Sequence, residues 1–324
     1  MRITPLLAAA ILLAACGKIS SPTDPGTQLS AAGIYVSTAG GSVVVFPLTA
    51  SGNVAPSRKI SGASTGLSLP IGLAVDKSGS LYVANRTGSK ITVYALGANG
   101  DVAPTRALTD TAMKSPQAVY LDNTNDAVYA VTCPNCGGGA GGATGMFHFA
   151  AGSTVSDYFL RGANTGMTVP NGVGIDGSKN IYIGNAFGGT VNVYAPGAQG
   201  NTLPIRTITP GAGQNLQCTQ LSGNTITMTS PGVGILMYLS TAAASAPPAS
   251  TIPKSTTLPI AYPGCAYLDT SVAQPVLYVV DFSGNALYVA QTAGSAPNLS
   301  VTSVVTISGT LTGLTSPLGI TVVH

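Results

Sequence analysis

Short apolar runs separated by polar turns recur along most of the chain. The pattern is clearest over 70–76, 81–85 and 91–94, where β-branched and aromatic residues are bounded by Gly, Pro, Asn or Asp. Such runs are typical of β-strands joined by tight turns. The polar connection at 85–90 is short enough for a hairpin. No long stretch has the periodicity of an amphipathic helix, so the pattern predicts an all-β protein.

One position marks the second strand of each repeated unit. In chain order it is occupied by Tyr35, Tyr82, Tyr129, Tyr182, Ile226 and Tyr278. Neighbouring markers lie 44 to 53 residues apart, close to the ~40–50 residues of one four-stranded propeller blade. A unit of this size cannot bury its apolar face alone, so neighbouring units must stack. The repeat therefore predicts a six-bladed β-propeller of four-stranded antiparallel blades.

The first strand of each unit carries a small residue at an equivalent position, which fits the crowding of six strands around one axis. These residues are Gly72, Ala118, Gly172, Cys218, Cys265 and Gly319. The repeats open with a second-type strand at 33–37 and end with a first-type strand at 317–322. We expect the C-terminal strand to pair with the N-terminal blade and close the ring. A single propeller domain over 31–324 follows.

The repeat resembles the NHL-type propellers and, more loosely, the gluconolactonase and streptogramin lyase group. The resemblance rests on Pro-x-Gly-Leu-Ala-Val-Asp at 70–76, Leu-Tyr-Val-Ala-Asn at 81–85 and Val-Tyr at 93–94, and its repeat covers 31–324. The resemblance implies the architecture of the scaffold and not an activity, because one fold hosts many functions. The gluconolactonase-like metal site uses a Glu with Asn and Asp, and the lyases use His and Glu. The chain contains no Glu, so neither set carries over.

The N-terminus has the pattern of a bacterial lipoprotein signal. Arg2 precedes an apolar run over 6–15 that is too short for a permanent transmembrane helix, and Leu-Ala-Ala-Cys-Gly follows at 13–17. The pattern predicts cleavage before Cys16 and lipidation of Cys16 with acyl chains such as palmitate. Each methylene buried in the membrane would contribute about 0.8 kcal/mol.

These features divide the chain into a signal peptide at 1–15, a lipidated cysteine with a flexible tether at 16–30, and the propeller. Gly17 is not the Asp that commonly retains lipoproteins at the inner membrane of enteric bacteria. We therefore expect a lipid-anchored protein of the bacterial cell envelope, at the outer membrane if the organism is Gram-negative.

The composition is consistent with export. Only 7% of residues are charged, and the formal net charge is +3, too small to indicate nucleic-acid binding. We expect a monomer whose contacts are the membrane, through its lipid, and an envelope protein or glycan.

Four cysteines remain when Cys16 is set aside, an even number that suits an oxidising compartment. Cys218 and Cys265 occupy equivalent sites on the inner strands of adjacent blades, where a bridge would join the blades near the axis. Cys133 and Cys136 most simply close their own small loop. A second interpretation is a redox pair at Cys133–Cys136, but no helix N-terminus that would stabilise a thiolate is present there. A third is a zinc site, but only one close pair of cysteines is present. Structural disulfides are favoured.

Three polar residues end second strands in blades two, four and six, where loops rise from the ring. Asn85, Asn185 and Asp281 bear oxygens that are able to converge on a ligand or on a hard cation such as calcium. The same side chains also satisfy hairpin turns locally. The acidic residues that follow the first strands are interpreted as turn caps: Asp76, Asp122, Asp176 and Asp269.

No constellation of nucleophile, base and acid is visible. His148 is expected at an outward-facing strand position, and His324 lies at the chain end. Neither is a credible general base without a positioned partner. Arg58, Arg106 and Arg206 lie in predicted outermost strands, where they are expected to discourage edge-to-edge pairing.

The leading hypothesis is therefore a non-catalytic, membrane-anchored propeller lipoprotein that binds a protein, peptide or glycan partner and holds no cofactor. The alternative is a divergent metal-dependent hydrolase of lactonase type, or a lyase, with its site at the channel mouth around Asn85, Asn185 and Asp281. Metal content and a calcium-induced thermal shift discriminate between them.

Overall fold

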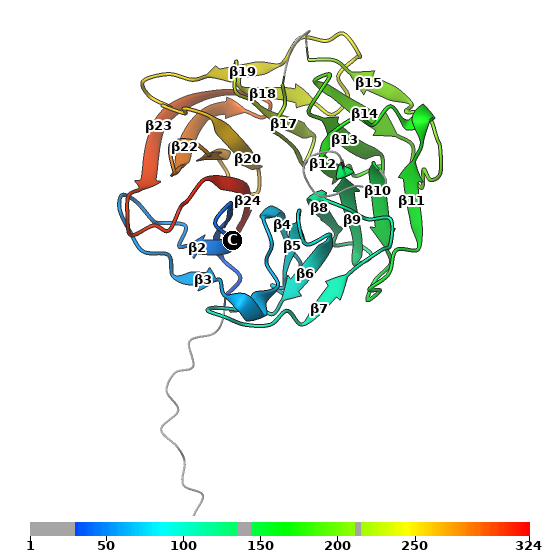
Figure 1. The fold of residues 1–324 in the computed structure, drawn as a ribbon. Coiled ribbons are helices and arrows are strands. Elements are labelled where there is room, and N and C mark those ends of the chain that lie inside the picture. Colours follow the sequence, from blue (N-terminus) through cyan, green and yellow to red (C-terminus); the bar gives the residue numbers. More distant parts are fainter. Residues whose placement is uncertain (1–29, 135–143, 211–214) are drawn as a thin grey trace, which may run out of the picture.

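The computed structural model describes residues 30–134, 144–210 and 215–324. The predicted signal peptide, Cys16 and nearly all of the predicted tether lie outside these ranges. The described residues form six antiparallel sheets of four strands each, arranged as blades around a common axis (Figure 1). The predicted fold class is confirmed.

Each blade places its first strand nearest the axis, and sequence order then runs outward. From the axis outward, the strands are β24 (Pro317–Val323), β1 (Gly33–Thr38), β2 (Ser42–Phe46) and β3 (Arg58–Ile60) in blade one; β4 (Pro70–Val75), β5 (Leu81–Asn85), β6 (Lys90–Tyr94) and β7 (Arg106–Leu108) in blade two; β8 (Pro116–Asp122), β9 (Ala127–Thr132), β10 (Gly145–Phe149) and β11 (Tyr158–Arg161) in blade three; β12 (Pro170–Ile175), β13 (Ile181–Asn185), β14 (Thr190–Tyr194) and β15 (Arg206–Ile208) in blade four; β16 (Cys218–Ser222), β17 (Thr225–Ser230), β18 (Gly234–Leu239) and β19 (Ser250–Pro253) in blade five; and β20 (Pro263–Asp269), β21 (Val276–Asp281), β22 (Ala286–Ser295) and β23 (Asn298–Ser308) in blade six. Short 3-10 helices lie at Ala63–Thr65 (η1) and Ala163–Thr165 (η3).

Blade one closes the ring as the order of strands along the sequence predicts. The C-terminal strand β24 pairs antiparallel with β1, with Ile34 opposite Val322 and Val36 opposite Ile320. Figure 1 shows the red end of the chain lying beside its blue start on the inner side of the ring. Because β24 is hydrogen-bonded into the first blade, the ring has no open seam between its two ends.

The apolar core lies between the flat faces of neighbouring blades. One cluster joins Tyr182 and Val193 of blade four to Ile226 and Tyr238 of blade five, all of them buried. The central strands are covered on both faces, which is why β5 and β13 are buried along their full length. Face-to-face sheet packing of this kind requires each blade to have a neighbour on both sides.

The perimeter is fastened by connections that reach from one blade to the one before it. The amide of Gly100 donates to the Lys59 carbonyl at 2.7 Å, and Gly200 donates to the Phe159 carbonyl at 2.7 Å. Gly52 makes the equivalent bond to Thr306 at 2.7 Å. Asp101, Asn201 and Asn53 follow these glycines and accept hydrogen bonds from the backbone amides of Ser64, Asn164 and Leu311.

The alternation of strand direction gives the ring two distinct faces. The turns between first and second strands and the connections between third and fourth strands lie at one end, which we call the turn face. The hairpins between second and third strands and the connections from blade to blade lie at the other end, which we call the loop face. Ala31, just before β1, lies beside Gly79 of the first turn in blade two, so the chain enters the ring from the turn face.

Candidate functional site

A cavity of ≈ 350 Å³ lies along the axis and is lined by the inner strand of every blade. Its polar lining side chains are Gln117, Tyr120, Asn123, Asn171, Gln217, Thr219, Gln220, Ser222, Tyr267, Asp269, Thr270, Ser271 and Thr321. Convergent polar groups in a concave cavity make this channel the candidate functional site.

The backbones of adjacent inner strands approach each other closely around this channel. A Cβ atom added to Gly319 would lie 1.9 Å from the Ile71 carbonyl oxygen, and one added to Gly172 would lie 2.0 Å from the Thr219 carbonyl oxygen. Real Cβ contacts are not that short, so these positions require glycine. The small-residue register predicted for the inner strands therefore has a direct steric cause.

The polar side chains between blades four and five bind one another and the backbone. Asn171 donates through Nδ2 to the Leu216 carbonyl at 2.7 Å, and its Oδ1 accepts from the Thr219 hydroxyl at 3.4 Å. Gln220 donates to the Ile320 carbonyl of β24 at 3.1 Å. These bonds connect inner strands across the channel and hold its lining in a defined arrangement.

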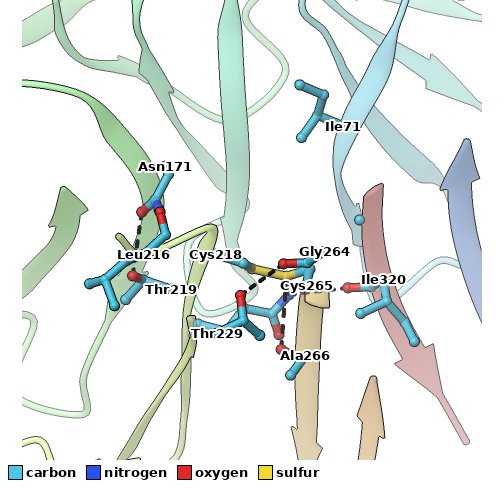
Figure 2. Close-up of a disulfide and its surroundings, with 12 residues drawn as sticks. Ile71, Asn171, Leu216, Cys218, Thr219, Thr229, Gly264, Cys265, Ala266 and Ile320 are labelled. Carbon is cyan, nitrogen blue, oxygen red and sulfur yellow. Dashed lines mark hydrogen bonds between the residues drawn. A yellow bond between two sulfur atoms is a disulfide. The ribbon is translucent and has the colours of Figure 1, made fainter. Parts of the chain in front are cut away.

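Cys218 and Cys265 form a disulfide in the channel wall, with their Cα atoms 5.0 Å apart. Figure 2 shows the bridge between the inner strands of blades five and six, beside the Thr229–Gly264 hydrogen bond. The prediction that these two equivalent positions are bridged is confirmed. Cys133 is buried immediately after β9, whereas Cys136 lies outside the described residues, so the Cys133–Cys136 bridge stays a prediction.

A histidine–aspartate pair lies at the turn-face end of the channel. His324 Nε2 is hydrogen-bonded to Asp269 Oδ2, and Ser271 donates to Asp269 Oδ1 through its amide and its hydroxyl. Burial alone would raise the pKa of Asp269, but the bonds from Ser271 and His324 outweigh it, so the pKa lies below its usual value. Ser271 contacts the carboxylate and not the imidazole, so these residues lack the nucleophile-to-base contact of a serine triad.

The three loop-end residues predicted as ligand candidates are fully buried and bound within their own blades. Asn85 Oδ1 accepts from the Ser68 amide at 2.9 Å, and Nδ2 donates to Thr92 at 2.8 Å. Asn185 repeats the pattern with the Thr168 amide at 3.1 Å.

Asp281 is the equivalent of these asparagines in blade six. It accepts from the amides of Ala261, Tyr262 and Gly284 at 2.7, 2.9 and 3.1 Å. The structure thus places the three predicted residues at equivalent points of separate blades, where each pins a hairpin to the preceding loop. A role for them in binding a ligand or calcium stays a prediction.

The carboxylates after the first strands cap their turns, as the sequence indicates. Asp76 Oδ1 accepts from the amides of Ser78 and Ser80, each at 2.9 Å. Asp122 also forms an ion pair with Lys179 of blade four at 2.7 Å. Burial would raise the pKa of Asp122, but hydrogen bonds from Lys179 and Thr124 bring it below the usual value.

His148 lies in the interior, not at the outward-facing position expected from the sequence. Its ring stacks on Tyr158 at 4.2 Å and meets Tyr129 edge-on at 4.8 Å, and Nδ1 contacts Asp157 Oδ1 at 2.6 Å. Tyr129, His148 and Tyr158 share one cross-strand row. The expectation was wrong because alternation along a strand shows only on which face of the blade a side chain lies. In a propeller both faces of a blade are covered by neighbouring blades, so neither face is exposed to solvent.

The perimeter arginines reach back across their blades. Arg58 donates to the Tyr35 hydroxyl at 2.9 Å, and Arg106 donates to the Tyr82 hydroxyl at 2.6 Å. In each pair, the tyrosine and the arginine lie in the same cross-strand row of the blade, with one valine of the third strand between them. The arginines do lie in outermost strands, but the sequence did not reveal these tyrosine partners. The nearly equal Tyr-to-Arg spacing in these two repeats, 23 and 24 residues, was the signal that would have found them.

The described part of the chain has no group of three or more His, Cys, Asp or Glu side chains placed to hold a metal ion. In the same ranges, no helix is long and apolar enough to cross a bilayer.

No protein-family model and no curated protein matches the sequence. Solved structures do match. A functionally unknown protein from Desulfotomaculum acetoxidans DSM 771 has a TM-score of 0.58 and 12% identity, over 85% of this chain and 80% of that chain. A chain of the nidogen/laminin complex has a TM-score of 0.58 and 14% identity, over 89% of this chain and 96% of that chain. At these identities the likeness shows the fold alone.

Proposed function

We propose that this protein is a non-catalytic, lipid-anchored propeller of NHL type in the bacterial cell envelope, and that it binds a protein, peptide or glycan partner across its loop face. The observation that carries the proposal is that the loop face is held in place by a repeated set of hydrogen bonds. A surface that is already ordered loses little conformational entropy when a partner binds.

The repeated bond joins each hairpin of the loop face to the connection that precedes its blade. Arg86 donates from its amide to the Leu69 carbonyl at 3.1 Å, and Ala186 donates to the Val169 carbonyl at 2.8 Å. Phe282 and Ala39 make equivalent bonds in blades six and one. Together with the buried Asn85, Asn185 and Asp281 side chains, these bonds support a preorganised binding surface.

The direction of chain entry supports the same proposal. The segment before β1 reaches the ring at the turn face, as the contact between Ala31 and Gly79 shows. A tether from a lipidated Cys16 would thus attach to the ring at its turn face and leave the loop face clear of the attachment point. The matched chain from the nidogen/laminin complex belongs to a protein–protein complex, which is a supporting analogy at the level of fold.

The test is chemical cross-linking in intact envelopes followed by capture of the full chain. We expect a reproducible partner with the wild-type chain and its loss with Cys16→Ser, which removes the lipid attachment site. Thr87→Glu on the loop face is expected to reduce capture, and Ser78→Glu on the turn face is its matched control. Capture of nothing beyond the Cys16→Ser background would contradict the proposal.

A further inference from the structure

The loop face carries three basic residues at blade two and at its border with blade three, Arg86, Lys90 and Lys114, which we call the basic edge. Arg86 lies in the hairpin between β5 and β6, and Lys90 begins β6. Lys114 lies in the connection that leaves blade two for blade three. All three residues are partly exposed.

Local contacts hold Arg86 and Lys90 at one end of blade two, whereas Lys114 lies at the border with blade three, where the Cys133 amide donates to the carbonyl of the next residue, Ser115, at 3.2 Å. Lys90 pairs with Asn85 across the hairpin, and its Nζ lies 3.2 Å from the position of a Cβ added to Gly66. The Thr87 and Ser68 hydroxyls are hydrogen-bonded at 2.6 Å, which fastens the hairpin to the preceding loop. Met113, next to Lys114, packs in the same core cluster as Ile91.

None of the ion pairs among the described residues involves the basic edge. The four ion pairs in these residues are Lys77–Asp126, His148–Asp157, Lys179–Asp122 and His324–Asp269, and topology places all four at the turn face. Asp110, the carboxylate on the same connection as Lys114, accepts from the Ala112 amide and the Ser156 hydroxyl. The hairpin and this connection together carry three basic residues and one acidic residue, Asp110, so an excess of positive charge remains.

Two buried polar atoms without a hydrogen-bond partner also lie at this end of the ring. They are Nε of Arg86 and the hydroxyl of Ser115, the residue after Lys114. Burial lowers the pKa of the Arg86 guanidinium, although an arginine stays charged at neutral pH. The guanidinium therefore keeps its positive charge at this edge.

The surroundings of the basic edge favour a sugar over a protein surface. The hairpin offers the hydroxyl-bearing residues Thr87 and Ser89. Large hydrophobic side chains that are exposed in the described residues, such as Phe187 and Leu203, lie on blade four and on other blades. Protein-binding hot spots are typically aromatic or apolar anchors, which blade two does not present at this edge.

We propose that the basic edge recognises an anionic glycan through its carboxylate or phosphate groups. This inference rests on the proposed function, because it names the partner class that the loop face would bind. Lysine and arginine head groups pair with such anions through charge-assisted hydrogen bonds, and neighbouring hydroxyls bind sugar hydroxyls.

The test is calorimetric titration of the purified full chain with oligogalacturonate, which carries one carboxylate per sugar. A neutral maltooligosaccharide of equal length and a polyglutamate peptide are titrated in parallel. We expect oligogalacturonate to bind at 50 mM NaCl with an affinity that falls at 150 mM NaCl, and the other two probes to bind at least tenfold more weakly. The Lys90→Gln, Lys114→Gln double variant should lose at least tenfold in affinity.

The matched control is the Lys59→Gln, Lys77→Gln double variant, which removes the same charge from the perimeter and the turn face. It should bind within twofold of the wild-type chain. Equal weakening by both double variants, no binding of oligogalacturonate, or equal binding of polyglutamate would each overturn the inference. Envelope capture that succeeds while oligogalacturonate fails defeats this inference alone, whereas failed capture of any envelope component defeats the proposed function.

Discussion

The Ser37 hydroxyl accepts a hydrogen bond from the Gly319 amide at 3.0 Å, although the two residues are 282 positions apart. The same hydroxyl donates to the Ile71 carbonyl at 2.7 Å. One side chain therefore joins β1 and β24 of blade one to β4 of blade two. This bond network lies at the point where the ring closes.

Substitution of Ser37 by Ala should weaken that closure. The Gly319 amide would lose its acceptor in a buried site, and such a loss costs about 1–3 kcal/mol. We expect the free energy of unfolding in urea to fall by this amount, with Ser51→Ala, at an exposed position, as the control. Equal stability of the two variants would contradict a role of Ser37 in closure.

Gly319→Ala should destabilise the ring more than Gly177→Ala. A Cβ on Gly319 meets the Ile71 carbonyl oxygen at 1.9 Å, whereas nothing lies within 4 Å of a Cβ on Gly177. Forced overpacking of this kind costs about 1–3 kcal/mol. Thermal unfolding monitored by circular dichroism measures the difference, and indistinguishable melting temperatures would argue against tight inner-strand packing.

Removal of the Cys218–Cys265 disulfide should destabilise the protein without changing its fold. The bridge spans 47 residues, and cross-links that close loops of this order contribute about 2–4 kcal/mol. The Cys218→Ala, Cys265→Ala double variant should show that loss in denaturant titration. Reducing agent should affect its stability less than that of the wild-type chain, and the opposite result would count against a stabilising bridge.

Stability should fall in acid. The pKa values of Asp122, Asp176 and Asp269 lie below the unfolded value of 3.8 because hydrogen bonds to each carboxylate outweigh burial. The stabilisation from these groups is present above pH 3.8 and is lost as the pH falls through their folded-state pKa values. The denaturation midpoint should therefore stay level at higher pH and drop below about pH 3.8, and Asp122→Asn should flatten that dependence.

Asp281→Ala distinguishes a structural carboxylate from a calcium ligand. Three backbone amides would lose their acceptor, and the loss should cost about 2–4 kcal/mol, since each unsatisfied buried donor is expensive. If Asp281 only pins its loop, calcium leaves the melting temperatures of both the wild-type chain and the variant unchanged. A calcium-induced rise in the wild-type melting temperature that Asp281→Ala abolishes would instead support the metal-dependent alternative.

The sequence by itself determined the six-bladed ring, its closure by the last strand and the Cys218–Cys265 bridge. These features follow from residues at equivalent positions of a repeat, such as Tyr82 and Tyr182, because local strand patterns and fixed spacing impose the same backbone path on every unit. The turn-capping role of Asp76 was predictable for the same reason, since its partners lie within four residues.

Only the tertiary structure decided which distant side chains meet. Asp269 and His324 are 55 residues apart and Asp122 and Lys179 are 57 apart, and no local pattern specifies either pair. The burial of His148 and the separation of the basic edge from the ion pairs of the turn face likewise depend on how the blades pack. Contacts between blades arise when the blades pack together in three dimensions. A sequence repeat predicts such contacts only for residues at equivalent positions of the repeat.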